Sequence, residues 1–107
     1  MKFKVTDKIL DYDGQAIKET EDQDLNWKRV IHTALNNSTR DEVLTAEIKE
    51  KCYQITTKVY KTNEPDLTVS EIAFVLERIG KIYTSPLIIG RSEEYFNKKT
   101  PEEEAKV

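Results

Sequence analysis

Apolar residues recur at helical spacing in the middle and C-terminal parts of the chain, and this pattern predicts three amphipathic helices. We expect them over about residues 25–36, 46–61 and 69–83. In each stretch the apolar positions are three or four residues apart, so they share one face of the helix. In the first stretch these positions are Trp27, Val30, Ile31, Ala34 and Leu35. The three faces together predict a helical core.

Capping residues predict where these helices begin. Asp24 and Thr45 are the expected N-caps of the first two, because short polar side chains accept hydrogen bonds from the free N–H groups of the first turn. Thr68 and Glu71 fit a capping box, in which each side chain bonds the backbone N–H of the other residue. The third helix therefore has the strongest start signal of the chain.

A fourth helix is predicted over about residues 86–96. Ser85 is a preferred N-cap, and Pro86 suits the first helical position because its φ is already close to the helical value. Residues 97–107 are polar, contain Pro101 and have no apolar period. We expect them to form a flexible tail.

The first 24 residues predict a small β-hairpin and a linker. Two short β-prone pieces within residues 3–18 flank Asp13-Gly14, a pair typical of hairpin turns. The acidic stretch 19–24 is predicted to be a linker or the lead-in to the first helix. The expected fold is therefore α+β and mostly α. A short N-terminal hairpin precedes a bundle of three to four helices, in one domain over residues 1–96.

Composition supports one small globular domain and disfavours several classes of protein. The chain has 107 residues, of which 37% are hydrophobic and 35% charged, with a net charge of −3. No apolar run approaches the length of a membrane span, and the N-terminus does not resemble a secretory signal. We therefore expect a cytoplasmic protein. The single Cys52 excludes an internal disulfide, and the single His32 leaves little material for a metal site.

No residue pattern indicates catalysis, a metal or a cofactor, so we expect a protein that is not an enzyme. Asp11-Tyr12-Asp13-Gly14 is similar to the start of a calcium loop, but the glycine comes too early and the final glutamate is missing. Cys52 lies on an apolar face, where a free cysteine behaves as a small hydrophobe. His32 lies beside the apolar face of the first helix, which favours a structural or surface role.

DNA binding is the alternative function. Residues 68–73 resemble the start of the second helix in a helix-turn-helix domain, yet the apolar stripe continues to Tyr83, too far for that motif. Lys51, Lys58 and Lys61 form only a mild basic stripe, typical of a solvated face. Residues 64–96 carry three basic and six acidic groups, which disfavours nucleic acid as a partner. The alternative would be a transcription regulator with a degenerate helix-turn-helix.

The fourth predicted helix offers a candidate partner-binding surface. Leu87, Ile88 and Ile89 cover about 200° of a helix, more than a surface helix usually buries. Either this segment is buried on nearly all sides, or part of it contacts a partner. Leu87, Arg91 and Tyr95 share one face, and aromatic residues and arginine are enriched at interface centres. The predicted partner-binding residues are Leu87, Ile88, Arg91 and Tyr95.

Three stretches of the chain resemble small accessory proteins of tailed bacteriophages and prophages. They are KVTDKILDYDGQAI, KCYQITTKVYK and PDLTVSEIAFVLERIGKIYTSPLIIGR, which lie within residues 4–91. The resemblance implies a non-enzymatic protein–protein interaction module in the bacterial host cell. Such a protein would assist particle assembly or inhibit a host protein. Its partner would be a phage or host protein, or a second copy of the chain, with no membrane involved.

Overall fold

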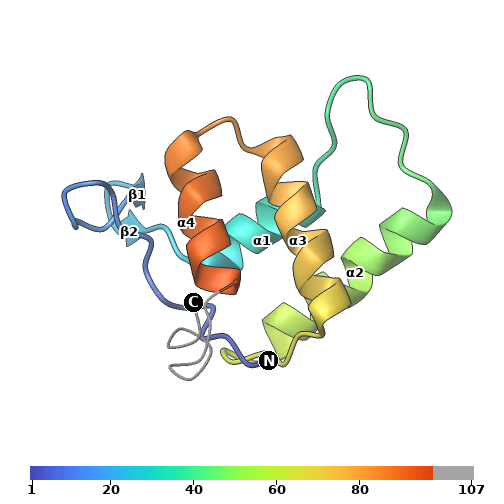
Figure 1. The fold of residues 1–107 in the computed structure, drawn as a ribbon, viewed down its shortest axis with the longest axis horizontal. Helices are drawn as coiled ribbons and strands as arrows, with labels where there is room; N and C mark the ends of the chain where they lie inside the picture. The colour runs from blue at the N-terminus through green and yellow to red at the C-terminus, as the bar shows by residue number, and fades with distance from the viewer. Residues whose placement is uncertain (98–107) are drawn as a thin grey trace, which may run out of the picture.

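The computed structural model describes residues 1–97, and residues 98–107 lie outside the described part. Six elements follow one another along the chain (Figure 1). They are β1 (Lys18–Thr20), β2 (Gln23–Asp24), α1 (Trp27–Leu35), α2 (Ala46–Lys61), α3 (Val69–Ile82) and α4 (Pro86–Phe96). The antiparallel strand pair followed by helices confirms the predicted α+β, mostly α fold.

α1 and α3 are the central pair of helices. α3 packs against both α1 and α4, while α2 packs against α1. Figure 1 shows α3 and α4 side by side with a short connection, and α2 at the edge of the molecule. The segment 36–45, which joins α1 to α2, arches outward beyond the helices. The exposed side chains of α2 include Tyr53 and Tyr60.

The predicted starts of α2, α3 and α4 are confirmed. Thr45, Thr68 and Ser85 each accept a hydrogen bond from a backbone N–H of the first turn. The Glu71 carboxylate accepts a bond of 2.9 Å from the Thr68 N–H, which completes the capping box. Each of these contacts joins residues three apart, so the sequence pattern alone could reveal them.

The prediction that Asp24 caps the first helix is wrong. α1 begins at Trp27, and the side chain of Asn26 accepts the bond from the Arg29 N–H at 3.0 Å. The Asp24 carboxylate instead lies 2.6 Å from the Lys18 ammonium and 2.9 Å from that of Lys8. Hydrogen bonds from these two lysines lower the pKa of Asp24. This carboxylate therefore joins the N-terminal segment to the end of β2.

The hairpin lies later in the chain than predicted. Its strands, β1 and β2, fall mostly in the stretch 19–24, which was expected to be a linker. The predicted turn at Asp13-Gly14 does form, with Gly14 at a φ of +82°. There the Asp11 carboxylate accepts the N–H groups of Asp13 and Gln15 at 2.8 and 3.0 Å. The residues flanking this turn make only an isolated bridge, so the expected strands over 3–18 are wrong.

The first ten residues form no regular strand because their backbone groups bond to several separate segments. The bonds run from Phe3 N to Pro65 O, from Val5 N to Asn63 O and from Ile9 N to Leu25 O, at 3.0–3.2 Å. This segment is therefore held between the connection that follows α2 and the residues that precede α1. The side chains of Phe3, Val5 and Ile9 are buried.

A single hydrophobic cluster joins the N-terminal segment to all four helices. It contains every apolar residue predicted to lie on the inner face of α1, together with Cys52, Ile55 and Val59 of α2. Ile79 of α3 is fully buried, and Phe96 closes the cluster from α4. The predicted tail begins at Asn97, which caps the C-terminus of α4. The rest of that tail lies outside the described residues, so its flexibility stays a prediction.

A buried arginine holds the connection between α1 and α2. Arg78 of α3 is only 2% exposed, and its guanidinium donates to the carbonyls of Ala34 and Asn37 at 3.3 and 2.6 Å. It also forms an ion pair with the Glu42 carboxylate. Arg78 lowers the pKa of Glu42, with help from the Thr39 N–H. Arg78 was not among the residues singled out from the sequence.

Candidate functional site

Arg91 of α4 fixes the loop that precedes the strands. Its Nε lies 3.0 Å from the Leu10 carbonyl and its Nη2 lies 2.8 Å from the Asp11 carbonyl. Its Nη1 pairs with Glu94 at 3.4 Å. A planar guanidinium has five N–H donors in a rigid fork, so it can bond two neighbouring carbonyls and a carboxylate together. Arg91, which was predicted to contact a partner, therefore holds a loop of its own chain in place.

Tyr95 joins α4 to the first residues of the chain. Its hydroxyl lies 2.7 Å from the Lys4 carbonyl and 3.0 Å from an Asp7 carboxylate oxygen. Its ring stacks on Trp27 with centroids 5.0 Å apart. Burial raises the pKa of Tyr95, and the Asp7 carboxylate raises it further. The hydroxyl therefore stays protonated and acts as a hydrogen-bond donor.

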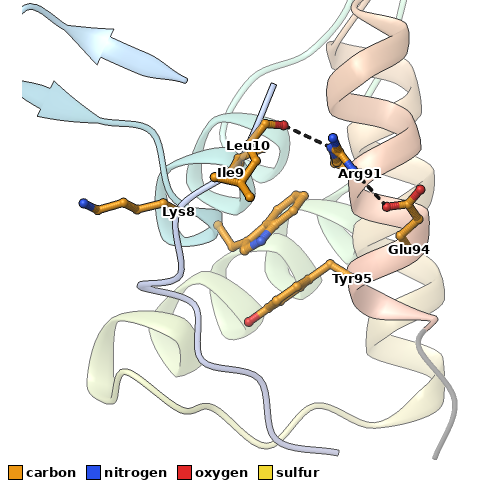
Figure 2. Close-up of a pocket in the computed structure, with 7 residues that line it drawn as sticks. Lys8, Ile9, Leu10, Arg91, Glu94 and Tyr95 are labelled. Carbon is orange, nitrogen blue, oxygen red and sulfur yellow. Dashed lines mark hydrogen bonds and ion pairs between the residues drawn. The ribbon is translucent and has the colours of Figure 1, made fainter. Parts of the chain in front are cut away.

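A pocket of about 250 Å³ lies between these two side chains and the N-terminal segment (Figure 2). The rings of Trp27 and Tyr95 form part of its wall, and Arg91 and Glu94 border it from α4. Figure 2 shows Lys8, Ile9 and Leu10 on the facing segment. The dashed lines mark the contacts of Arg91 with Leu10 and Glu94.

A second hollow, of about 200 Å³, continues along α4. It shares Arg91 and Glu94 with the first pocket and is also lined by Tyr12, Pro86, Leu87 and Gly90. We call the two hollows together the α4 groove, and its residues are Leu10, Tyr12, Leu87, Arg91 and Glu94. Tyr12 is 78% exposed and Leu10 is 44% exposed. The groove therefore presents apolar side chains to solvent beside a fixed ion pair.

The structure separates the predicted partner-binding residues into two groups. Ile88 is buried in the hydrophobic cluster, so it contributes to the core and is not available to a partner in the folded domain. Leu87 and Arg91 line the α4 groove, and Tyr95 borders its inner pocket. Sequence reasoning missed Leu10 and Tyr12, which come from the other end of the chain. Partner binding by this face stays a prediction.

A further groove lies between α1 and α2. It has a volume of about 500 Å³ and is lined by His32, Asn36, Tyr53, Thr56, Thr57, Tyr60 and Lys61. An adjoining hollow of about 420 Å³ shares Asn36 and Tyr53 with it and extends to Lys49. We call the two together the α1–α2 groove. The sequence signal that could have indicated it is the spacing of Tyr53 and Tyr60, which are seven residues apart and therefore share one side of α2, beside its buried face.

The predicted basic stripe on α2 does not form one surface. Lys58 pairs with Glu71 of α3 at 2.8 Å, and the Lys51 ammonium lies 4.9 Å from the centre of the Phe74 ring. Lys61 alone of the three borders the α1–α2 groove. Two of the lysines therefore contact α3, while Lys51 and Lys61 remain exposed, as predicted for a solvated face.

His32 and Cys52, the two residues considered for catalysis, lie in different surroundings. The ring of His32 meets Tyr60 edge-on, with centroids 5.6 Å apart. Cys52 is buried, and burial raises the pKa of its thiol, which keeps it in the unreactive protonated form. Among residues 1–97, no group of three or more His, Cys, Asp or Glu side chains is placed to hold a metal ion.

Comparisons with known proteins add no relative. No protein-family model, curated protein or solved structure matches this chain. In the described part of the chain, no helix has the length and apolar character needed to cross a membrane. Any functional argument therefore rests on the surfaces described above.

Proposed function

We propose that this protein is a non-enzymatic protein–protein interaction module, similar to the accessory proteins of tailed bacteriophages, and that the α4 groove contacts its partner. The observation that carries the proposal is the Arg91 clamp. By bonding the Leu10 and Asp11 carbonyls, Arg91 holds a loop that exposes Leu10 and Tyr12 beside Leu87. The partner is another phage or host protein, or a second copy of the chain.

Physical chemistry supports binding by such a surface. A large aromatic side chain that is exposed in an ordered loop can bury much apolar area at little cost in side-chain entropy. The loop is already fixed by two hydrogen bonds from Arg91 and by the turn at Asp11. Less conformational freedom is then lost when a partner binds.

The polar residues favour binding over catalysis. A nucleophile needs a base within hydrogen-bond reach, whereas Cys52 is buried with a raised pKa and His32 contacts an aromatic ring. α3 runs unbroken from Val69 to Ile82, which gives no support to a helix-turn-helix starting at Thr68. Both observations favour the interaction module over an enzyme or a DNA-binding regulator.

Tyr12→Ala tests the proposal because Tyr12 is mostly exposed. We expect the variant to keep the melting temperature of the wild type but to lose its partner in affinity capture from phage-infected cells, or its self-association in sedimentation. Val69→Ala is a matched control, since Val69 is equally exposed at 77% but lies at the start of α3. Arg91→Glu is a poorer test, because it also releases the loop. Capture and self-association that both match the wild type in Tyr12→Ala would remove the α4 groove from the proposal.

A further inference from the structure

Two exposed tyrosines and three lysines give the α1–α2 groove a chemistry that the α4 groove does not have. Tyr53 is 71% exposed and Tyr60 is 46% exposed, and both line the groove. The Lys28 ammonium lies 5.2 Å from the centre of the Tyr60 ring, and Lys61 lines the groove at the same end. Lys49 lines the adjoining hollow at the other end. Aromatic surface therefore lies between positive charges.

These three lysines differ from most other cations of the fold in having no acidic neighbour. Within residues 1–97, no carboxylate lies at ion-pair distance from Lys28, Lys49 or Lys61. By contrast, Lys58 pairs with Glu71 and Arg78 pairs with Glu42. Residues 25–63 contain seven basic and four acidic groups, in a chain with a net charge of −3. Positive charge is thus concentrated on the segment that forms this groove.

We propose that the α1–α2 groove binds a short acidic peptide segment of another protein, in extended form. The lysines of the groove complement the charge of an acidic segment along a defined length. Lys49 and Lys61 are twelve residues apart on α2, which corresponds to about 18 Å of helix. An extended peptide of about five or six residues covers this length.

The chemistry of the groove specifies the peptide in more detail. Carboxylates at both ends of the segment would pair with Lys49 on one side and with Lys28 and Lys61 on the other. An apolar or aromatic side chain in its middle would pack between Tyr53 and Tyr60, since tyrosines are common anchors of interfaces. The hydroxyl of Thr57, which also lines the groove, can bond the peptide backbone, whereas the Thr56 hydroxyl already donates to the Cys52 carbonyl.

Single-stranded nucleic acid uses similar residue types, but the observations favour the peptide. Bases stack on tyrosines and phosphates bind lysines, yet nucleic-acid binding needs many phosphate contacts to be strong. Three lysines provide few such contacts. Residues 1–24 and 64–96 each contain three more acidic than basic groups, so the surrounding charge repels an extended polyanion. A short peptide would contact only the groove.

Fluorescence polarisation with two labelled peptide pools tests the inference. One pool has Asp or Glu at both ends around a central Leu, Phe or Tyr, and the other has Lys in place of the acids. We expect the full chain to bind the acidic pool only, and more weakly as salt is added. Tyr53→Ala should weaken binding about tenfold or more, as expected for an interface anchor. Lys61→Glu should weaken binding of the acidic pool and strengthen binding of the basic pool.

Matched controls separate this inference from the proposed function. Tyr12→Ala removes a similarly exposed tyrosine on the α4 groove and should bind the acidic pool like the wild type. Melting temperatures of Tyr53→Ala and Lys61→Glu show that the fold is retained. The inference is overturned if the acidic pool does not bind, or if Tyr53→Ala and Lys61→Glu bind like the wild type. The inference would also be overturned if oligo-dT bound more strongly than the acidic pool. Self-association in sedimentation that Tyr53→Ala removes would overturn it as well, because a second copy would then occupy the groove.

Discussion

Arg78 joins α3 to residues 34–42, which lie 36 to 44 positions earlier in the sequence. Replacing it with methionine removes the donors to the Ala34 and Asn37 carbonyls and the cation beside Glu42. Unsatisfied buried acceptors cost about 1–3 kcal/mol, so we expect Arg78→Met to lower the free energy of unfolding by about that amount. Urea unfolding measures it.

The control for Arg78 is Lys81→Met. Lys81 also lies near Glu42, at 3.6 Å, but its side chain is 48% exposed. Exposed ion pairs contribute little, so a change below about 0.5 kcal/mol is expected. If both variants lost the same free energy of unfolding, the buried hydrogen bonds of Arg78 would not be the source of its stabilising effect.

Glu42 makes the fold sensitive to acid. Its pKa is lowered in the folded state from the ordinary 4.5, chiefly by the hydrogen bond from Arg78. A carboxylate with a lowered pKa contributes stability that is present above about pH 4.5 and is lost as the pH falls through the folded value. Melting temperatures of the wild type and Glu42→Gln should differ at pH 7 and converge below pH 4.5. A difference that does not change with pH would contradict this role.

At the scale of elements, α3 depends on its capping box and more strongly on its buried face. Thr68→Ala removes the acceptor for the Glu71 N–H, with an expected cost of about 0.5–2 kcal/mol. Ile79→Ala leaves a cavity at a fully buried site and should cost about 2–5 kcal/mol. Val69→Ala, at an exposed position of the same turn, should change little. Chemical denaturation measures both losses of stability. A larger loss for Thr68→Ala than for Ile79→Ala would contradict the start of α3 at Val69.

The α4 helix holds the N-terminal loop through Arg91. Arg91→Met removes the bonds to the Leu10 and Asp11 carbonyls. Each hydrogen bond contributes about 0.5–1.5 kcal/mol, so the loss of both should make opening of the loop about five to 150 times more frequent. Hydrogen exchange should rise at the Asp13 and Gln15 amides and stay unchanged in α3. Exchange that rises evenly over the whole chain would indicate global destabilisation instead.

At the scale of the whole molecule, residues 1–97 contain the hydrophobic cluster and the capped ends of all four helices. A chain that ends at Asn97 should therefore melt within about 2 °C of the full protein, because residues beyond it have no apolar period. Scanning calorimetry checks this. A drop of about 10 °C would show that residues 98–107 add substantial packing.

The distribution of charge also belongs to this scale. Residues 25–63 have a positive excess, and the segments on either side of them are acidic. The two grooves accordingly differ: the α4 groove combines apolar side chains with the Arg91–Glu94 pair, whereas the α1–α2 groove has lysines without acidic neighbours. The proposed partners differ for the same reason.

The sequence determined the features that depend on neighbours three or four residues apart. Thr45, Thr68 and Ser85 cap helices through contacts within one turn, and the apolar faces follow from helical periodicity. The burial of Cys52 was predictable in the same way. These interactions are local, so their residues are visible together in the sequence.

Only the tertiary structure decided the features that join distant residues. Asp24 was available as a cap, but Lys8 and Lys18 bind it, so Asn26 takes that place. Likewise, the α4 groove needs Arg91 to meet Leu10, 81 residues away. Side chains at such separations become neighbours only when the helices pack. The periodicity of the chain specifies which faces pack inward, but not which polar groups then meet across them.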